Sequence, residues 1–559
     1  MRRSKLLPYL LVAACSIIYF LPFLHVVSHH ADEGTLMTNA VRVAEGELPF
    51  RDFFEVSGLG TFYWLAIFFK LLGTTWLASR ICLLLTTTGI VVLLFYLARR
   101  LRFGTGLMPA IFFVAVSRDH WNMISHHMDS TLFGLLAFAL FLLWMGAPRP
   151  FILFLAGAAA GLTTWCMLTK GALLCLSLVL LLGILYRGGS RLRGLLTLLG
   201  GYFLVIVSVL ALFWRAGGLP GLIDDNLLWP LANYTGVNAA PYGLGFRQLC
   251  WDSLGGFRLA FPPVTTMAVS AFLAVPFLVV LGLPVLLAIL CLPYRRVAFG
   301  RAALPYWLAG GAFWLSEMHR IDLGHLVFGC PIFVILAFYL WSQASGKLAH
   351  GALQLVATCT FVLAMQNPLV ALSAFTKIYT PRGVVRDVFS EDLPVLQFLN
   401  ERIKPGEPIF VYPYTPVYYF LSAARNPTRY STLVYGFNTE AQFRDAVRSL
   451  ETNNVRYVVW DRSAQWLPRA FPAYRAPSRD KLIMEPYLED HYRVVAGTDT
   501  GFQLLERKEP PAREAELHRS AACFHDEQLK SLHRARFGSV PIETRWHSCW
   551  MTRESSLDE

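Results

Sequence analysis

Charged residues in the first two thirds of the chain are sorted into two alternate sets of loops. Every acidic residue between Met1 and Phe375 falls in one set, and the short loops of the other set carry arginine and lysine but no acid. Short loops rich in basic residues stay in the cytoplasm, because moving cations outward opposes the membrane potential. The pattern therefore predicts a multi-pass membrane protein whose acidic loops face outward. The acidic set is Asp32, Glu33, Glu45, Glu47, Asp52, Glu55, Asp119, Asp129, Asp224, Asp225, Asp252, Glu317 and Asp322.

Apolar segments long enough for a bilayer recur through the same region. The chain is 55% hydrophobic and 15% charged, with a mean hydropathy of +0.47, which soluble enzymes do not reach. At roughly 20 apolar residues per membrane helix, we expect about eleven spans and a mainly α fold. The first span follows basic residues as a signal peptide would, but no small-residue cleavage site follows it, so we expect it to be retained. The expected spans are Leu6–Val27, Trp76–Leu97, Gly106–Val116, Ser130–Met145, Phe151–Leu168, Leu173–Tyr186, Leu195–Trp214, Val264–Leu292, Leu304–Leu315, Leu326–Trp341 and Leu353–Phe375.

A net charge of +12 could indicate nucleic-acid binding. The basic residues cluster at the ends of the expected spans, however, so membrane topology and anionic lipids explain them better, and we expect no nucleic-acid partner. The sequence contains no P-loop, Rossmann fingerprint or zinc-ligand spacing. Most of the ten cysteines lie in or near apolar segments. Cys523 and Cys549 lie in a polar tail, where a disulfide is one alternative if the tail is outside.

Composition changes to ordinary globular usage near Lys377. We therefore divide the chain into a membrane domain (1–375), a small α/β domain (376–508) and a polar tail (509–559) that we expect to be largely disordered. An odd number of spans from a cytoplasmic N-terminus places the α/β domain outside the membrane. Its expected elements are the strands Ile409–Tyr412 and Arg456–Trp460 and the helices Pro416–Ala423 and Thr439–Asn453.

The first outward loop carries charged residues directly after the first span. The order is His29-His30-Ala31-Asp32-Glu33-Gly34, followed by two amphipathic stretches, Thr35–Glu45 and Thr61–Leu72. Two helices lying on the membrane surface are the simplest structure for this pattern. Asp32 would then lie at the boundary between water and lipid.

This arrangement resembles the GT-C superfamily of polyprenyl-phosphate-sugar-dependent glycosyltransferases. The resemblance is particularly to the branch shared by the protein O-mannosyltransferases, the lipid A aminoarabinose transferases and the rhizobial core-oligosaccharide transferases. The order and sidedness of the motifs carry the resemblance over roughly Met1–Phe375. The motifs are Asp32-Glu33-Gly34, Glu45–Phe53, the amphipathic Tyr63–Gly73, Leu168-Thr169-Lys170-Gly171 and Arg320–Leu326.

The resemblance implies transfer of a sugar from a polyprenyl phosphate to an acceptor on the outer side of a bacterial-type plasma or inner membrane. Such a site needs a carboxylate near the acceptor and cations near the leaving phosphate. Asp32 matches the first-loop acid of the family; the alternative is an acid that only caps the helix after it. Glu33 either assists acceptor binding or is simply solvated. Asp129 best matches a second acid near the start of the fourth span, with Asp119 as the other choice.

Cations and metal ligands are also available in the outward loops. Lys170, Arg320, Asp322 and His325 are candidates for binding the donor headgroup. Lys170 could instead snorkel to the membrane surface, and the other three could form a salt bridge that fixes their loop. A divalent metal is a candidate cofactor. Its candidate ligands are His126, His127 and Asp129, together with His29 and His30.

The long outward loop Arg215–Pro263 interleaves aromatic with small residues, including Trp229 and Tyr234. Aromatic rings stack on sugars and lipid chains, and they also anchor proteins at membrane interfaces. Two other functions remain open at this level. One is a transporter or flippase of lipid-linked glycans, and the other is a non-catalytic envelope-assembly protein on the same scaffold. The expected partners are the lipid-linked donor, membrane lipids and an envelope glycan, lipid or protein as acceptor.

Overall fold

The computed structural model describes residues 3–27, 31–56, 58–101, 106–117, 123–186, 190–248, 262–293, 295–344, 346–372, 376–387, 393–462, 471–497 and 501–508. Several expectations concern residues outside these ranges: His29, His30, Asp119, the pair Cys523 and Cys549, and the tail 509–559. The chain separates into two compact units, Met1–Glu506 and Arg507–Glu559. The elements below belong to the first unit, and the domain boundaries drawn from the sequence stay predictions.

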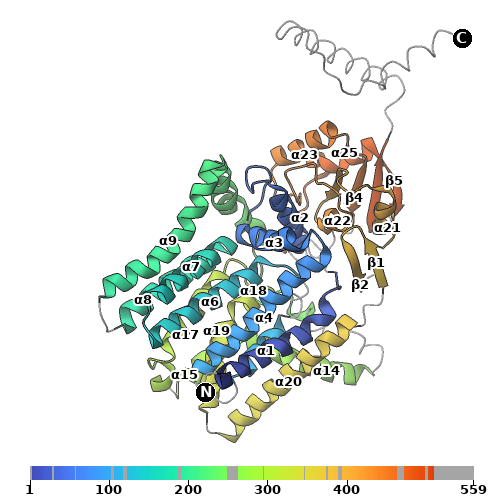
Figure 1. The fold of residues 1–559 in the computed structure, drawn as a ribbon. Helices are drawn as coiled ribbons and strands as arrows, with labels where there is room; N and C mark the ends of the chain where they lie inside the picture. The colour runs from blue at the N-terminus through green and yellow to red at the C-terminus, as the bar shows by residue number, and fades with distance from the viewer. Residues whose placement is uncertain are drawn as a thin grey trace, which may run out of the picture. The chain divides into compact units, whose positions relative to one another are not determined.

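A bundle of apolar helices forms most of this unit (Figure 1). Among the described residues, seven helices are long and apolar enough to cross a membrane, or eight if the bent pair α18 and α19 is one span. The mainly helical, multi-pass fold is thus confirmed. The seven are α1 (Arg3–Phe20, continued by η1, Leu21–Phe23), α4 (Trp76–Arg100), α6 (His126–Gly146), α8 (Leu168–Leu185), α9 (Arg191–Arg215), α14 (Pro263–Leu281) and α20 (Lys347–Leu372).

The expected number of about eleven spans is not confirmed. The remaining apolar helices are shorter, and α5 (Met108–Val116) has nine residues, which rise about 14 Å against a hydrocarbon core of about 30 Å. Helices α18 (Leu323–Gly329) and α19 (Pro331–Ser342) meet at a bend of 68°. The other short helices are α7 (Pro150–Cys166), α15 (Leu283–Cys291), α16 (Arg295–Ala298) and α17 (Leu304–Ser316).

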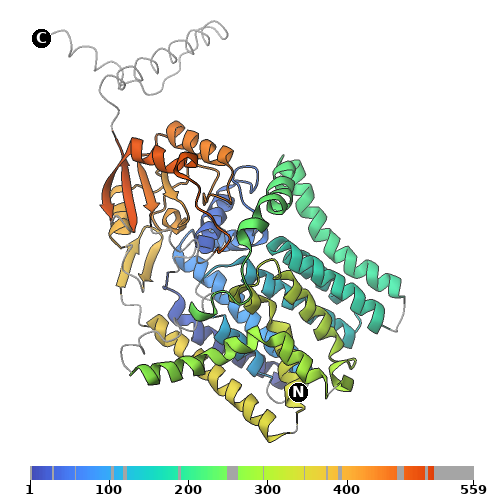
Figure 2. The ribbon, with the colours of Figure 1, turned by 180° about the vertical axis from the view of Figure 1, so that it is seen from behind.

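Glycines allow the closest helix contact in the bundle, between α7 and α9, which lie side by side with α8 in Figures 1 and 2. A Cβ atom on Gly157 would stand 1.9 Å from the Leu198 carbonyl oxygen, and one on Gly201 would stand 2.0 Å from that of Phe154. Small residues on both helices let the two backbones touch, as in many membrane helix pairs.

The two helices expected between the first two spans are present as α2 (Ala31–Glu45) and α3 (Leu59–Leu72), which pack on each other. The turn between them is held by polar contacts. Arg42 pairs with Glu47 at 2.6 Å, and the Asp52 carboxylate accepts from the Leu48 amide at 2.7 Å. A long segment continues from α9 through α10 (Leu219–Ile223), the π-helices η3 (Asp224–Leu228) and η4 (Pro230–Tyr234), and α11 (Thr235–Asn238).

The C-terminal part of the first unit contains the sheet region. Strands β1 (Thr376–Thr380) and β2 (Gly383–Asp387) form a hairpin, and a second sheet has the order β3-β4-β6-β5. Strand β3 runs parallel to β4, and β6 runs antiparallel to it. The strand predicted at Ile409–Tyr412 is confirmed as β3. The remaining elements are α21 (Leu393–Arg402), α22 (Val417–Leu421), α23 (Glu440–Thr452), β4 (Tyr457–Asp461), η7 (Arg479–Lys481), α25 (Met484–His491), β5 (Tyr492–Gly497) and β6 (Phe502–Arg507).

Candidate functional site

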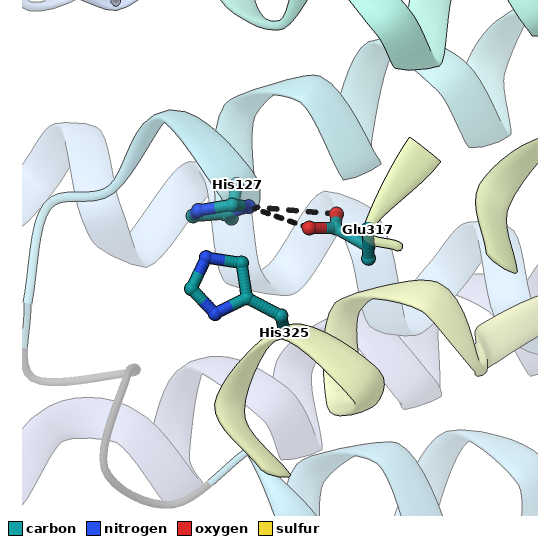
Figure 3. A group of neighbouring side chains, drawn as sticks. All are labelled: His127, Glu317 and His325. Atoms are coloured by element: carbon teal, nitrogen blue, oxygen red, sulfur yellow. Dashed lines mark hydrogen bonds and ion pairs between the residues drawn. The ribbon is translucent and has the colours of Figure 1, made fainter. Parts of the chain in front are cut away.

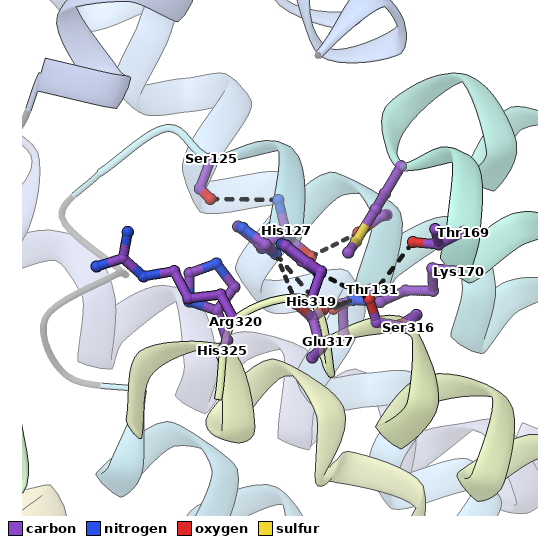
Figure 4. A network of polar contacts seen from close by, with 12 residues as sticks. Ser125, His127, Thr131, Thr169, Lys170, Ser316, Glu317, His319, Arg320 and His325 are labelled. Carbon is purple, nitrogen blue, oxygen red and sulfur yellow. Dashed lines mark hydrogen bonds and ion pairs between the residues drawn. The ribbon is translucent and has the colours of Figure 1, made fainter. Parts of the chain in front are cut away.

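A buried ion pair lies where α6, α8 and α17 come together (Figure 4). Lys170, in the first turn of α8, places Nζ 2.7 Å from Glu317 Oε1, and both side chains are 0% exposed. The second Glu317 oxygen lies 3.3 Å from Nδ1 of His127, which is in the first turn of α6. Burial raises the pKa of the Glu317 carboxyl, but the charge of Lys170 and the contact with His127 outweigh this effect and hold the pKa well below its usual range.

A row of imidazole rings continues from this ion pair. The centroids of the His126 and His127 rings are 4.1 Å apart, and those of His127 and His325 are 4.8 Å apart. The His319 ring lies 5.2 Å beyond that of His325. Burial, followed by the charge of His325, lowers the pKa of His319. Figure 3 shows His325 below the His127 ring and Glu317 at the edge of that ring. The His319 imidazole is therefore neutral at neutral pH, where one of its ring nitrogens can donate a hydrogen bond and the other can accept one.

Arg320, Asp322 and His325 bond to one another, as one of the two sequence alternatives stated. Asp322 contacts Arg320 Nε and accepts from His325 Nδ1 at 2.8 Å, and as N-cap of α18 it also accepts from the His325 amide at 3.0 Å. Burial raises the pKa of Asp322, but His325 and Arg320 together hold it below its ordinary value. Arg320 also reaches Asn238 Oδ1 at 2.5 Å and lies 4.6 Å above the Phe471 ring. Donor binding by this cluster stays a prediction.

The three consecutive residues Asp32, Glu33 and Gly34 face three different environments. Glu33 is 0% exposed and forms a bidentate pair with Arg80 of α4, at 2.6 and 3.0 Å. Gly34 touches the α/β region, since a Cβ there would stand 2.3 Å from the Val417 nitrogen. Asp32 is half-buried, and its charge acts on the His126 ring. The two neighbours of Asp32 in the motif thus fix its position beside the imidazole row.

Asp129 is buried away from that row. Its Oδ1 accepts from the Thr86 hydroxyl at 3.4 Å, on the side of α6 that faces α4. The structure therefore does not bring His126, His127 and Asp129 together as the predicted set of metal ligands. The catalytic role of Asp129 stays a prediction.

His127, Glu317 and His325 form the candidate metal site instead. Their ligand atoms lie within 4.8 Å of one another. Two imidazoles and one carboxylate are a set that zinc and similar divalent ions accept. The same carboxylate already pairs with the Lys170 ammonium, which would compete with a bound cation. The group can thus hold a metal only if Lys170 and the metal share Glu317.

Sequence reasoning did not single out Glu317 or Arg80. Both carried a signal, because an ionisable residue inside or beside an apolar segment is expensive and usually has a function. Arg80 follows Trp76 inside an apolar helix, and Glu317 directly precedes the charged cluster that begins at Arg320. The sequence alone does not show their partners. Glu33 lies 47 residues from Arg80, and His127 lies 190 residues from Glu317.

The chain was compared with known proteins. No protein-family model matches the sequence, and no curated protein matches it. Among solved structures, ArnT from Cupriavidus metallidurans in the apo state aligns with a TM-score of 0.52 at 13% identity, over 90% of this chain and 98% of that chain. ArnT bound to undecaprenyl phosphate aligns with a TM-score of 0.51 at 13% identity over the same shares. The chain therefore has the GT-C fold of ArnT, as the sequence resemblance implied.

AglB from Archaeoglobus fulgidus, an archaeal oligosaccharyltransferase, aligns with a TM-score of 0.47 at 12% identity, over 90% of this chain and 75% of that chain. The fold assignment rests on the two ArnT structures alone.

Proposed function

We propose that this chain is an integral membrane glycosyltransferase that moves a sugar from a polyprenyl phosphate to an acceptor in the cell envelope. The observation that supports it most is the ArnT fold over 90% of the chain, because ArnT was solved with undecaprenyl phosphate bound. The described site adds the residue types that the reaction needs. A half-buried acid, Asp32, lies beside imidazoles, and a guanidinium, Arg320, lies at the other end of the row.

In the proposed reaction Asp32 takes the proton of the acceptor hydroxyl or amine. The freed lone pair forms a bond to the anomeric carbon, and the bond from that carbon to the phosphate oxygen breaks, so that the phosphate leaves with the electron pair. Charge thus develops on the phosphate, where Arg320 and His325 would stabilise it. Asp322 would keep both side chains in place, since it contacts each of them.

We assign Lys170 to positioning rather than to direct contact with the donor. Its side chain is fully buried and bound to Glu317, so it neither snorkels to the surface nor faces a donor in this conformation. Glu317 in turn orients the His127 ring. Glu33 has a similar supporting role through Arg80, and it keeps Asp32 at the start of α2.

The substitution Asp32→Asn tests the proposal. We expect transfer to fall by about two to four orders of magnitude, because the general base is lost with little change in shape. Mass spectrometry of lipid-linked and envelope glycans, with and without the protein, identifies the donor and acceptor. Purified wild type and variant are then assayed with those substrates. Wild-type turnover by a well-folded Asp32→Asn protein would refute the assignment.

We also propose that α2 and the α/β region lie on the outer side of the membrane, as the loop charges predict. Glu45 at the end of α2 and Ser190 before α9 are both exposed. In a background without accessible native cysteines, Glu45→Cys should react with a membrane-impermeant thiol reagent added from outside, and Ser190→Cys should react only after the membrane is opened. The reverse labelling pattern would overturn the orientation.

A further inference from the structure

A second cluster of polar and aromatic side chains lies on the outer segment that follows α9. It consists of Asp225 of η3, Trp229 between η3 and η4, Phe54 from the turn after α2, and Arg429 and Tyr430 from the α/β region. The Trp229 and Phe54 ring centroids are 5.3 Å apart, and those of Phe54 and Tyr430 are 5.9 Å apart. Three segments distant in sequence therefore meet at one place.

Two polar atoms of this cluster are buried without a bond. Among the described residues, neither the Asp225 Oδ2 atom nor the Trp229 Nε1 atom has a hydrogen-bond partner. A buried group in this state costs free energy of about 1 to 3 kcal/mol, so a native protein seldom keeps one without a use. An aromatic residue that anchors a protein at the membrane interface keeps its N–H in the wet headgroup layer. The buried Trp229 N–H does not fit that role.

Hydrogen bonds tie Phe54, Arg429 and Tyr430 of the cluster to their neighbours. Arg429 Nη2 donates to the Phe50 carbonyl at 3.2 Å, and the Phe54 amide donates to the Arg429 carbonyl at 2.8 Å. The Tyr430 hydroxyl donates to Asp445 Oδ2 at 3.1 Å. Burial raises the pKa of Asp225 to about 6, although the charge of Arg429 opposes the shift.

We infer that this cluster is a sugar-binding subsite that takes one ring of a glycan, an inference that rests on the proposed function. One unsatisfied atom, Asp225 Oδ2, only accepts, and the other, Trp229 Nε1, only donates. A hydroxyl group both donates and accepts, so adjacent hydroxyls of one sugar can satisfy both atoms. The Phe54 ring, which is partly exposed, supplies apolar surface for the C–H face of the sugar, and the buried Tyr430 ring packs behind it. The sugar belongs either to the acceptor or to the lipid-linked donor, since both present hydroxyls.

The test measures binding and needs no transfer. The full-length protein in nanodiscs is mixed with a panel of methyl glycosides, and saturation-transfer NMR reports those that contact it. We expect wild type to bind at least one glycoside, and Asp225→Asn and Trp229→Phe to bind it about tenfold or more weakly. The matched control is Asp224→Asn, which removes the same charge from an exposed position one residue earlier. It should bind as wild type does.

Thermal unfolding is recorded for each variant. Trp229→Phe keeps an aromatic ring next to Phe54, so its weaker binding at an unchanged unfolding temperature would support the subsite. Failure of every glycoside to bind wild type, or unchanged binding by both variants, would overturn it. These outcomes do not depend on whether wild type transfers sugar, so failure of the proposed function is recognised separately.

Transfer kinetics distinguish the two sources of the sugar. A raised KM for the acceptor with an unchanged KM for the donor in Trp229→Phe would assign the subsite to the acceptor. The opposite split would assign it to the donor sugar. Either split supports a sugar site, whereas unchanged KM values for both substrates would count against it.

Discussion

Among the described residues of the membrane bundle, two fully buried ion pairs differ in how completely their charges are satisfied. In the Glu33–Arg80 pair both carboxylate oxygens bind the guanidinium, the Ile124 amide donates to Glu33 Oε1 at 2.9 Å, and Arg80 lies 3.9 Å above the Trp76 ring. In the Lys170–Glu317 pair one oxygen has the ammonium at 2.7 Å, and the other faces the His127 ring at 3.3 Å.

This difference separates a structural pair from one suited to a reaction. A bidentate pair with an additional amide donor has a single favourable geometry, so it fixes α2 against α4. A carboxylate shared between a lysine and a histidine can redistribute its contacts when a charge arrives nearby. His127 contacts Glu317 and also belongs to the imidazole row. A charge that reaches the row therefore changes the electrostatic environment of the Lys170–Glu317 pair.

The substitution with the largest expected effect breaks the structural pair. Glu33→Gln leaves the Arg80 charge buried without its counterion, which should cost about 3 to 5 kcal/mol of stability. We expect a large fall in the unfolding temperature of the purified protein. The double variant Glu33→Met with Arg80→Met removes both charges and should recover much of the loss. A Glu33→Gln protein as stable as wild type would show that the pair does not hold α2 in place.

Lys170→Met tests the other pair and should have a smaller effect on folding, because the Glu317 carboxylate can take up a proton when its counterion is lost, whereas the Arg80 guanidinium cannot lose its charge. Loss of the ammonium removes a charge-assisted contact of about 1.5 to 3 kcal/mol, and we expect transfer to slow by about one to two decades. Lys170→Arg should be less damaging, though not neutral, because the guanidinium differs in shape. Turnover and donor affinity are measured by titrating the lipid-linked sugar against both variants.

A pH profile distinguishes positioning from simple packing at this lysine. The Lys170 charge lowers the pKa of Glu317, so its removal should move the acid limb of the pH–rate profile to higher pH. Lys170→Arg keeps the charge and should leave that limb where it is in wild type. Unchanged turnover and an unchanged profile in Lys170→Met would mean that the pair only fills space.

The smallest expected effect concerns Asp322, which caps α18 beside the site. Asp322→Asn keeps a side chain that can cap the helix but loses the charge that Arg320 and His325 contact, which should cost about 1 kcal/mol at neutral pH. The pKa of Asp322 is lowered in the fold, so its stabilising contribution is complete above the unfolded-state value of about 3.9 and is lost as pH falls through the folded-state value. The difference in unfolding free energy between wild type and variant should therefore shrink below about pH 4. A difference that stays constant with pH would exclude an ionised cap.

Local patterns in the chain predicted much of the fold. The sidedness of the charges indicated a multi-pass membrane protein, and the apolar run Ile409–Tyr412 indicated a buried strand. The helix expected at Thr439–Asn453 is present as α23, where Thr439 and Gln442 form a capping box. These features depend on residues that are neighbours in sequence. The span count was not confirmed, because an apolar stretch such as Met108–Val116 can be a short buried helix as well as a full span.

The candidate site was predicted less completely, because its geometry depends on contacts between distant residues. The sequence pointed to Asp32, His127, Lys170, Arg320 and His325, and the described structure brings the last four into one network around Glu317. It did not reveal that Glu33, for which acceptor binding and plain solvation were the alternatives, is fully buried and paired with Arg80, or that Asp129 faces Thr86. A single residue's type does not state which partner will neutralise it.

Charge sidedness, hydrophobic length and helix capping depend on short stretches of sequence, and they sufficed to predict a multi-pass membrane protein. The partners of the buried charges were settled by packing. The contacts of Lys170 with Glu317, of Glu33 with Arg80 and of Gly34 with Val417 exist because helices far apart in sequence come together. In a low-dielectric interior a charge must be matched by whichever group packs against it, and that neighbour is known only once the chain has folded.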